Sequence, residues 1–321
     1  MQVEVTRGDL VESLHEVHLC AATPSGEVAL RSGDIESPVF LRSTAKPFIA
    51  AAVLAAGARE RFDLTMPEIA VMSASHMGEP FHVDAVRAIL AKIGMDESAL
   101  LCGPQDERSP DPVYNNCSGK HAGILALCTI LGADPAGYRE AGHPAETAIL
   151  DFCARLSGDD AAAWPLGVDG CGIPVYATSL RKAAMAFARF ASLTELAPRD
   201  AMALLAVRDA MVSYPAYVSG THEFDTRLMA AAGGAVACKV GAEGVHGVAL
   251  IPQGLGIASK VLDGTGRARP PATMAALRAL AVPVAEAADL RGFAHPTVYN
   301  RAGRAVGSIR VAPGFAVEQA S

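Results

Sequence analysis

The chain has 321 residues, of which 51% are hydrophobic and 19% charged, and its formal net charge is −7. This composition excludes an intrinsically disordered chain, which combines few apolar residues with high charge. The acidic balance also lacks the basic surface with which proteins bind nucleic acids or anionic membranes. The length is sufficient for a sizeable core and fits one large domain or two modest ones.

Targeting and redox features point to the cytoplasm. The first residues carry charge from Glu4 onward and lack the apolar stretch of a signal peptide. The longest apolar run, near 48–58, is shorter than the roughly 18 residues of a membrane span. The cysteines are odd in number and have no compact spacing, so we expect reduced thiols in a cytoplasmic protein.

In chain order, the sequence first predicts strands over 2–7 and within 15–30, with a turn at 24–26. Strands cluster near both ends and helices lie between them. This order favours a single α/β unit over 1–321, with a sheet part from both termini and a helical part at roughly 80–235. The other predicted elements are helices at 44–57, 80–93, 119–132, 144–157, 177–191, 199–213 and 273–286, and strands at 236–240, 246–251 and 255–262.

A Ser-x-x-Lys pattern begins the helix predicted at 44–57. Its members are Ser43 and Lys46, and Pro47 requires that they stand at the first helical turn, with Ser43 near the N-cap. The positive helix end and burial both lower the pKa of a lysine, which lets the neutral amine act as a general base toward a serine hydroxyl. By itself the pattern equally fits an ordinary capped helix start.

Two later segments supply a second serine and lysine. Ser75 lies in a loop of small and polar residues at 73–78, and Lys239 leads a short strand into a Gly-rich turn. The second segment has the layout of the Lys-[Ser/Thr]-Gly element of penicillin-recognising enzymes, apart from Val240 in the middle position. Residues 114–116 also match the Tyr-x-Asn element of those enzymes. The plainer interpretations are a turn serine and a solvated strand end.

Two cysteines form a candidate metal site. Cys117 directly precedes the helix at 119–132, whose N-terminus favours a thiolate, and Cys171 lies in the Gly/Pro turn at 169–174. Two thiolates and one nitrogen donor, either His121 or Lys120, would bind zinc and leave a fourth position open. The alternative is a pair of reduced cysteines in tight turns. We expect the other five cysteines to be buried packing residues.

Taken together, these segments resemble the rhizobial-type (class 3) L-asparaginases, the asparaginase II family of Ser-Lys amidohydrolases. The resemblance implies a serine β-lactamase/glutaminase-like fold, hydrolysis of L-asparagine to L-aspartate and ammonia, and a homodimer. It also implies a zinc ion that positions the substrate or shapes the pocket. The matching segments are 3–8, 11–15, 42–47, 73–76, 116–123, 169–174, 239–244 and 254–258.

The resemblance implies a role for most of the candidate residues. It takes Lys120, not His121, as the nitrogen ligand of the metal. The implied sets are the catalytic pairs Ser43 with Lys46 and Ser75 with Lys239, and the zinc ligands Cys117, Lys120 and Cys171.

Three further residues are interpreted as substrate-binding: Arg42, Asp169 and His121. An arginine fork suits the substrate's α-carboxylate, although Arg42 also fits a surface ion pair and Asp169 a turn.

Our hypothesis for the reaction is that Lys46 deprotonates Ser43, which attacks the side-chain amide, while Ser75 and Lys239 relay protons. Which serine attacks is left open by the sequence, because each has a lysine partner. The alternatives are a glutaminase, a β-lactam-recognising enzyme and a non-catalytic relative.

Overall fold

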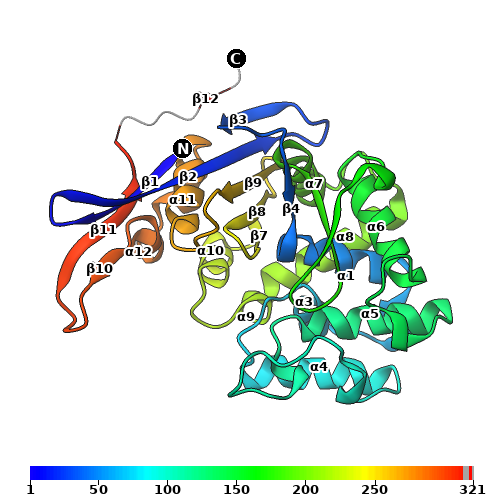
Figure 1. Ribbon diagram of the computed structural model, residues 1–321. Coiled ribbons are helices and arrows are strands. Elements are labelled where there is room, and N and C mark those ends of the chain that lie inside the picture. Colours follow the sequence, from blue (N-terminus) through cyan, green and yellow to red (C-terminus); the bar gives the residue numbers. More distant parts are fainter. Residues whose placement is uncertain (314–317, 320–321) are drawn as a thin grey trace.

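A curled antiparallel sheet built from both ends of the chain forms one part of the molecule (Figure 1). The computed structural model describes residues 1–313 and 318–319, so the predicted 1–321 unit includes six positions outside the described residues. The strand order is β10-β11-β1-β2-β9-β8-β7, with β3 beside β2 and β12 beside β3. The strands are β1 (Gln2–Arg7), β2 (Leu10–Ala22), β3 (Val28–Ser32), β7 (Val236–Val240), β8 (Val245–Leu250), β9 (Leu255–Val261), β10 (Thr297–Tyr299), β11 (Ala305–Val311) and β12 (Glu318–Gln319).

Helices cover both faces of this sheet. Strand β8 is buried along its whole length, and successive side chains on a strand point to opposite faces. His246 hydrogen-bonds Thr273 of α11 (Arg269–Ala279), whereas the next residue, Gly247, lies against Phe187 of α7 (Leu180–Ser192). The centre of the sheet is therefore enclosed by α11 on one face and α7 on the other, which explains why β8 and β9 are almost wholly apolar.

The close approach of α7 to the sheet gives a stability prediction. A Cβ at Gly256 would lie 2.0 Å from the Ala184 carbonyl oxygen and 2.2 Å from the Ala188 nitrogen. Because both atoms belong to helix backbone, Gly256→Ala is expected to lower the free energy of unfolding by roughly 3 kcal/mol, measured by urea denaturation. Gly292→Ala is the control, since its Cβ would meet nothing within 4 Å. Equal stability of the two variants would contradict this packing.

The helical part is organised around α1, which is buried from Lys46 to Leu54. An apolar character on all sides is expected of a helix enclosed by others, and α5, α6 and α8 pack around it. A small sheet, in the order β4-β6-β5, lies beside these helices. The strands of the small sheet are β4 (Pro38–Phe40), β5 (Leu166–Val168) and β6 (Pro174–Ser179). The helices of this part are α1 (Lys46–Ala55), α2 (Ala58–Phe62), α3 (Met66–Met72), α4 (Pro80–Lys92), α5 (Ser118–Leu131), α6 (Pro144–Leu156), α8 (Pro198–Ser213), α9 (Pro215–Val218) and α10 (Phe224–Ala232). Helix α12 (Arg291–Ala294) lies near α11.

The elements predicted from the sequence are confirmed in kind, with three corrections. The helix predicted at 177–191 begins only at Leu180, because 177–179 belong to β6 and the Ser179 hydroxyl caps the helix. The helix predicted at 273–286 begins at Arg269 and ends at Ala279, and 283–286 form a 3-10 helix. The sequence predicted neither the strands β4, β5, β6, β10, β11 and β12 nor the helices α2, α3, α9, α10 and α12.

The third correction concerns the start of α1. Ser43 is not the N-cap of α1: it lies in a preceding 3-10 helix (Arg42–Ala45), and Ala45 is the cap. Helix α5 begins at Ser118. The Ser118 hydroxyl donates to the Val113 carbonyl oxygen at 2.8 Å, outside the helix.

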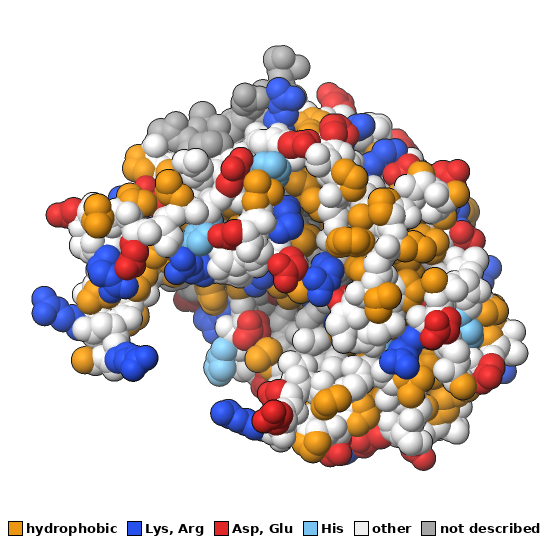
Figure 2. Space-filling model, viewed as in Figure 1, with side chains coloured by type: hydrophobic (Ala, Val, Ile, Leu, Met, Phe, Trp, Pro, Cys, Tyr) orange, Lys and Arg blue, Asp and Glu red, His pale blue; other side chains and the backbone are white. Residues whose placement is uncertain are grey.

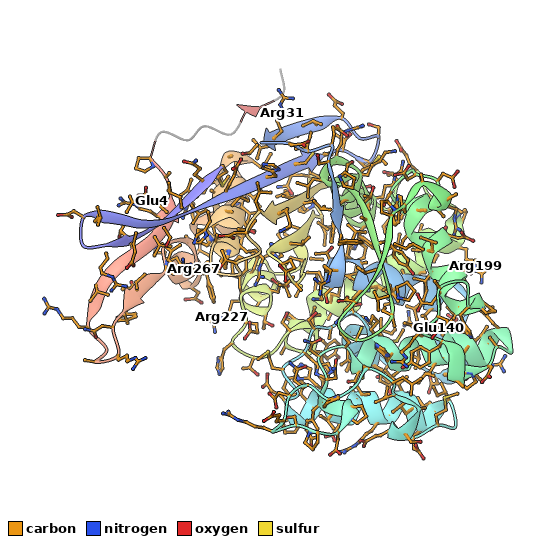
Figure 3. The ribbon with its side chains drawn as sticks, viewed as in Figure 1. Glu4, Arg31, Glu140, Arg199, Arg227 and Arg267 are labelled. Atoms are coloured by element: carbon orange, nitrogen blue, oxygen red, sulfur yellow. The ribbon has the colours of Figure 1, made fainter. Side chains whose placement is uncertain are left out.

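Polar contacts tie the terminal strands together. Glu4 on β1, labelled in Figure 3, accepts a hydrogen bond from Arg310 Nε on β11 at 2.6 Å. Arg267, also labelled, donates to His15 Nε2 on β2 at 3.0 Å. On the face shown in Figure 2, acidic and basic side chains are interspersed with hydrophobic ones. Within the described part of the chain, we find no helix that combines the length and the apolar character of a membrane span.

Candidate active site

Ser75 lies between two buried lysines. Its hydroxyl oxygen is 3.1 Å from Lys46 Nζ and 2.8 Å from Lys239 Nζ. Lys46 is the first residue of α1, Ser75 lies in the loop after α3, and Lys239 lies on β7, so three separate elements meet here. The Ser75 backbone N–H donates to the Val218 carbonyl oxygen at 2.9 Å, which fixes the loop. The structure thus brings together three of the four predicted catalytic residues through direct hydrogen bonds.

A close helix crossing sets this geometry. A Cβ at Gly119 of α5 would lie 2.1 Å from the Val71 carbonyl oxygen of α3, so only glycine permits the contact. The crossing places Asn116, just before α5, beside the Ser75 loop. Lys46 Nζ joins the two segments, because it contacts the carbonyl oxygens of Ala74 at 2.6 Å and Asn116 at 3.1 Å.

The two lysines can play different parts toward Ser75. Burial lowers the pKa of Lys46, and burial together with the positive charge of Lys46 lowers the pKa of Lys239 to about 7. A serine hydroxyl offers one hydrogen and two lone pairs, so it can donate to a neutral amine while it accepts from a charged one. This arrangement can hold a neutral lysine, which is a base, and a charged lysine, which is an acid, on one hydroxyl.

Ser43 is close in sequence to this group but separate in its hydrogen bonding. It lies in the 3-10 helix before α1, directly after Arg42, whose φ of 49° is uncommon for a residue with a side chain. The Ser43 side chain is partly exposed. Among the described residues, its hydroxyl has no hydrogen-bond partner, and Lys46 Nζ instead contacts Ser75.

Arg42 and Asp169, both predicted to bind substrate, contact each other. Arg42 donates to Asp169 Oδ1 from Nε at 3.0 Å and from Nη2 at 2.8 Å. The same oxygen accepts the Gly170 N–H at 2.7 Å. Burial alone would raise the pKa of Asp169, but Lys120, Gly170 and Arg42 lower it, so the group is a carboxylate. Its second oxygen takes no part in these bonds.

Cys117, Lys120 and Cys171 form one buried cluster. Lys120 Nζ donates to Cys171 Sγ at 3.0 Å. A hydrogen bond from Cys171, and the charge of Lys120, lower the pKa of Cys117, although burial opposes this. Two sulfurs and one amine, converging in a buried site, are a donor set that fits zinc, whose structural and catalytic sites favour sulfur and nitrogen. Lysine would bind as the neutral amine, so metal binding would release its proton.

His121 is buried on α5 beside this cluster. The Tyr138 hydroxyl accepts the Leu101 N–H at 2.8 Å and lies 2.6 Å from His121 Nδ1. His121 Nε2 is buried without a partner in the described structure, and it carries the ring hydrogen in the tautomer in which Tyr138 donates to Nδ1. Burial lowers the pKa of His121 and keeps it neutral. The five remaining cysteines are buried, as predicted from the sequence.

A buried network next to Lys239 was not predicted from the sequence. Asp225, Cys238 and His246 offer possible metal ligands that all lie within 4.8 Å of one another. Both Asp225 oxygens and both His246 nitrogens, however, are engaged in hydrogen bonds with protein groups, so we treat these residues as a hydrogen-bond network. The available signal was an Asp-Thr pair in a polar turn, which is too common to single out.

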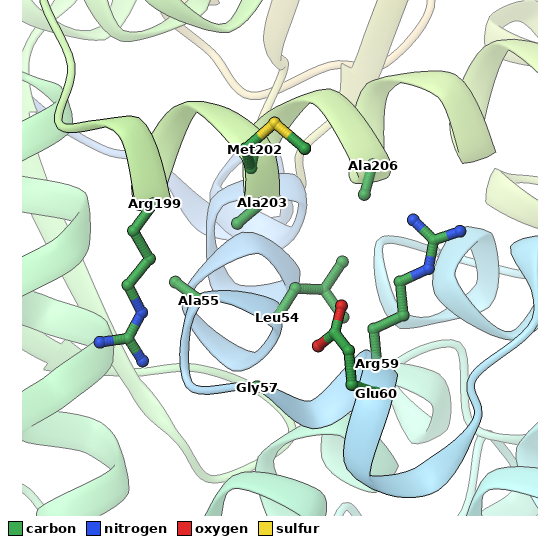
Figure 4. Close-up of a pocket in the computed structure, with 9 residues that line it drawn as sticks. All are labelled: Leu54, Ala55, Gly57, Arg59, Glu60, Arg199, Met202, Ala203 and Ala206. Carbon is green, nitrogen blue, oxygen red and sulfur yellow. The ribbon is translucent and has the colours of Figure 1, made fainter.

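The surface hollow in Figure 4 lies away from Ser75 and its two lysines. It is about 280 Å³ in volume, lies between α1, α2 and α8, and is lined in part by Leu54, Arg59 and Met202. It adjoins the far end of α1, roughly 12 Å along the helix from Lys46 at about 1.5 Å per residue. It contains none of the predicted site residues, and we assign it no catalytic part.

Comparison with known proteins identifies the family. A family model described as L-asparaginase II matches residues 3–311. The chain belongs to the L-asparaginase II family. The resemblance inferred from the sequence is therefore confirmed. No curated protein matches the chain.

Solved structures support the fold. Two structures of a protein called Mglu, one of them in 4.3 M NaCl, each give a TM-score of 0.50 at 14% identity and cover 89% of this chain. A third, in a tris and glutamate form, gives 0.50 at 13% identity and covers 84%. This chain spans 60 to 72% of the length of those chains. A beta-lactamase from Mycobacterium bovis, at 14% identity and a TM-score of 0.34, covers 78% of this chain and 88% of its own. The likeness to the three Mglu structures is consistent with the mixed α/β fold expected from the sequence.

Proposed function

We propose that this amidohydrolase hydrolyses L-asparagine to L-aspartate and ammonia through a serine acyl-enzyme. The observation that carries the proposal is the Ser75 hydroxyl, held at 2.8 and 3.1 Å by two buried lysines whose pKa values are lowered. Amide hydrolysis by acyl transfer needs a nucleophile, a base and an acid for the leaving amine. Such a pair of lysines on one hydroxyl can supply the last two.

In the proposed reaction, Ser43 is the nucleophile. Lys46 Nζ, which contacts Ser75 in the structure, turns to Ser43 and as a neutral amine takes the Ser43 proton while the oxygen attacks the carboxamide carbon. The carbon–nitrogen bond then breaks, and the leaving amine receives a proton that passes from charged Lys239 through Ser75. Water next attacks the aspartyl ester, the same groups take its proton, and Ser43 regains its hydrogen as L-aspartate leaves. The partly exposed Ser43 hydroxyl is free to attack, whereas Ser75 is already hydrogen-bonded on both sides, as suits a relay.

Substrate recognition is proposed for Arg42, Asp169 and His121. The unengaged oxygen of the Asp169 carboxylate suits an α-ammonium group, and the guanidinium of Arg42 suits an α-carboxylate. His121 Nε2 is buried without a partner among the described residues, and in the tautomer that places a hydrogen there, a substrate oxygen would be a favourable acceptor.

We further propose that Cys117, Lys120 and Cys171 hold zinc, which supplies positive charge and a fixed shape to the wall of the pocket. Cys171→Ser is expected to lower the zinc content of the purified protein at least about tenfold, measured by inductively coupled plasma mass spectrometry. Cys153→Ser is the matched control, because Cys153 is an equally buried thiol on α6. Zinc that is retained by Cys171→Ser, or lost equally from both variants, would contradict this ligand set.

The function is tested by incubating the purified chain separately with L-asparagine, L-glutamine and a chromogenic cephalosporin, and by measuring ammonia release or ring opening. We expect ammonia from L-asparagine. Ammonia from L-glutamine alone would replace the proposal with a glutaminase, and ring opening alone with a β-lactamase. No product from any of the three would refute the assignment.

A further inference from the structure

We propose that Asp225, on α10, is a positioning residue for Lys239, and that His246 holds Asp225 in place for this purpose. The inference rests on the proposed function, since it concerns one of the lysines that act on Ser75. Asp225 and His246 belong neither to the Ser-Lys pairs nor to the cysteine cluster, and neither is adjacent to Ser75 in the sequence.

The peptide groups of Val240 carry the link. Strand β7 ends the strand order of the sheet, so the N–H and C=O of Val240 that face outward have no strand partner. The Val240 N–H donates to Asp225 Oδ2 at 2.6 Å, and the Val240 carbonyl accepts from Lys239 Nζ at 2.8 Å. The same Nζ lies 2.8 Å from Ser75 Oγ. Asp225 therefore fixes the residue whose carbonyl holds the Lys239 amine against Ser75.

Asp225 is itself held on its other side. Its Oδ1 lies 3.0 Å from His246 Nε2, and His246 Nδ1 lies 2.8 Å from the Thr273 hydroxyl on α11. Burial lowers the pKa of His246 and keeps the ring neutral. Its Nε2–H then donates to Asp225, and the Thr273 hydroxyl donates to Nδ1. All three side chains are buried, and each of these donors and acceptors has one partner, as a rigid support requires.

The charge of Asp225 also reaches Lys239. Burial alone would raise the pKa of Asp225, but His246, Lys239 and Arg269 lower it, so the group is a carboxylate, and the Cys238 thiol next to it stays neutral. Burial lowers the pKa of Lys239, as do the charges of Lys46 on α1 and Arg269 on α11, while Asp225 and Cys117, directly before α5, raise it. Asp225 thus raises the pKa of Lys239 enough for the amine to be protonated near neutral pH.

Two variants separate the charge of Asp225 from its hydrogen bonds. Asp225→Asn keeps the shape, because its amide oxygen can accept the Val240 N–H and its amide nitrogen can donate to His246 in the other tautomer. Asp225→Ala removes both contacts. The titration of Lys239 is followed by NMR of protein labelled with 13Cε-lysine, with its signal assigned by its absence from Lys239→Met. Turnover of L-asparagine gives kcat and KM separately.

We expect Asp225→Asn to move the Lys239 titration midpoint down by about one pH unit, because a stabilising negative charge is lost. We expect Asp225→Ala to lower kcat roughly 100-fold, with KM within about threefold of its original value, since misplacing a reacting group affects the chemical step. Thr273→Val, which removes the partner of His246, should give a smaller loss of kcat in the same direction.

Glu68→Gln is the control for simple destabilisation, because Glu68 is a buried carboxylate on α3 that contacts Lys92 and the α3 N-terminus. It should leave the Lys239 midpoint and kcat unchanged. An unaltered midpoint in Asp225→Asn together with unaltered kcat in Asp225→Asn and Thr273→Val would overturn the inference, even if Asp225→Ala does not fold. Absence of ammonia from the unmodified protein would instead refute the proposed function, while the NMR titration would still report on Asp225.

Discussion

Replacing Ser75 with alanine is expected to lower kcat for L-asparagine roughly 1000-fold. The Ser75 hydroxyl is the only bridge between Lys46 and Lys239 within the described hydrogen bonds, so its loss breaks the route by which a proton reaches the leaving amine. A positioned acid or base contributes about 100- to 10,000-fold to a rate. The measurement is steady-state ammonia release at saturating L-asparagine, with circular dichroism as a check on folding.

The companion variant Ser43→Ala tests which serine attacks. If Ser43 is the nucleophile, the variant forms no acyl-enzyme at all, whereas Ser75→Ala forms one slowly. Acid quenching with L-asparagine, followed by peptide mass spectrometry, should find the aspartyl adduct on Ser43. An adduct on Ser75, or full activity in Ser43→Ala, would reverse the roles of the two serines. Ser37→Ala, at an exposed serine before β4, is the control.

Replacing Lys239 with methionine is expected to lower kcat at least about 100-fold and to change how stability depends on pH. Burial lowers the pKa of Lys239 from 10.5 to about 7 in the folded protein, so between these two values the unfolded chain binds more protons. The free energy of unfolding of the unmodified protein therefore rises with pH over this window, by an amount on the order of 4–5 kcal/mol from this group. Below about pH 7, Lys239 is charged in the folded protein as well, and the full cost of burying that charge lowers the free energy of unfolding.

The methionine variant lacks this contribution. Its advantage in unfolding free energy over the unmodified protein should be largest below pH 7 and should shrink toward pH 10, as measured by urea denaturation at several pH values. Lys182→Met, at an exposed position on α7, should show no such trend. A difference that does not vary with pH would mean that Lys239 keeps an ordinary pKa in the folded protein. A loss of activity joined to a gain in stability at neutral pH is typical of a buried functional charge.

The tertiary contacts changed the meaning of several sequence motifs. The spacing of Ser43 and Lys46 suggested a hydrogen-bonded pair, yet Lys46 Nζ contacts Ser75 and two carbonyl oxygens. Local spacing placed the two residues on one turn, but the direction of a buried amine is decided by the acceptors around it. Here those acceptors come from the ends of α3 and α5, which Gly119 lets approach each other. Arg42 and Asp169 likewise face each other across 127 positions of chain.

The family, the α/β class, the longer helices, part of the sheet and the identities of the candidate lysines, serines and cysteines follow from the sequence alone. These features depend on short motifs and on apolar periodicity, which are local properties of the chain. Packing between elements brings both lysines to Ser75, leaves His121 Nε2 buried without a partner among the described residues, and links Asp225 to Lys239 through Val240. Each of these depends on contacts between elements far apart in the chain, and burial, which sets the pKa of both lysines, exists only once those elements have packed.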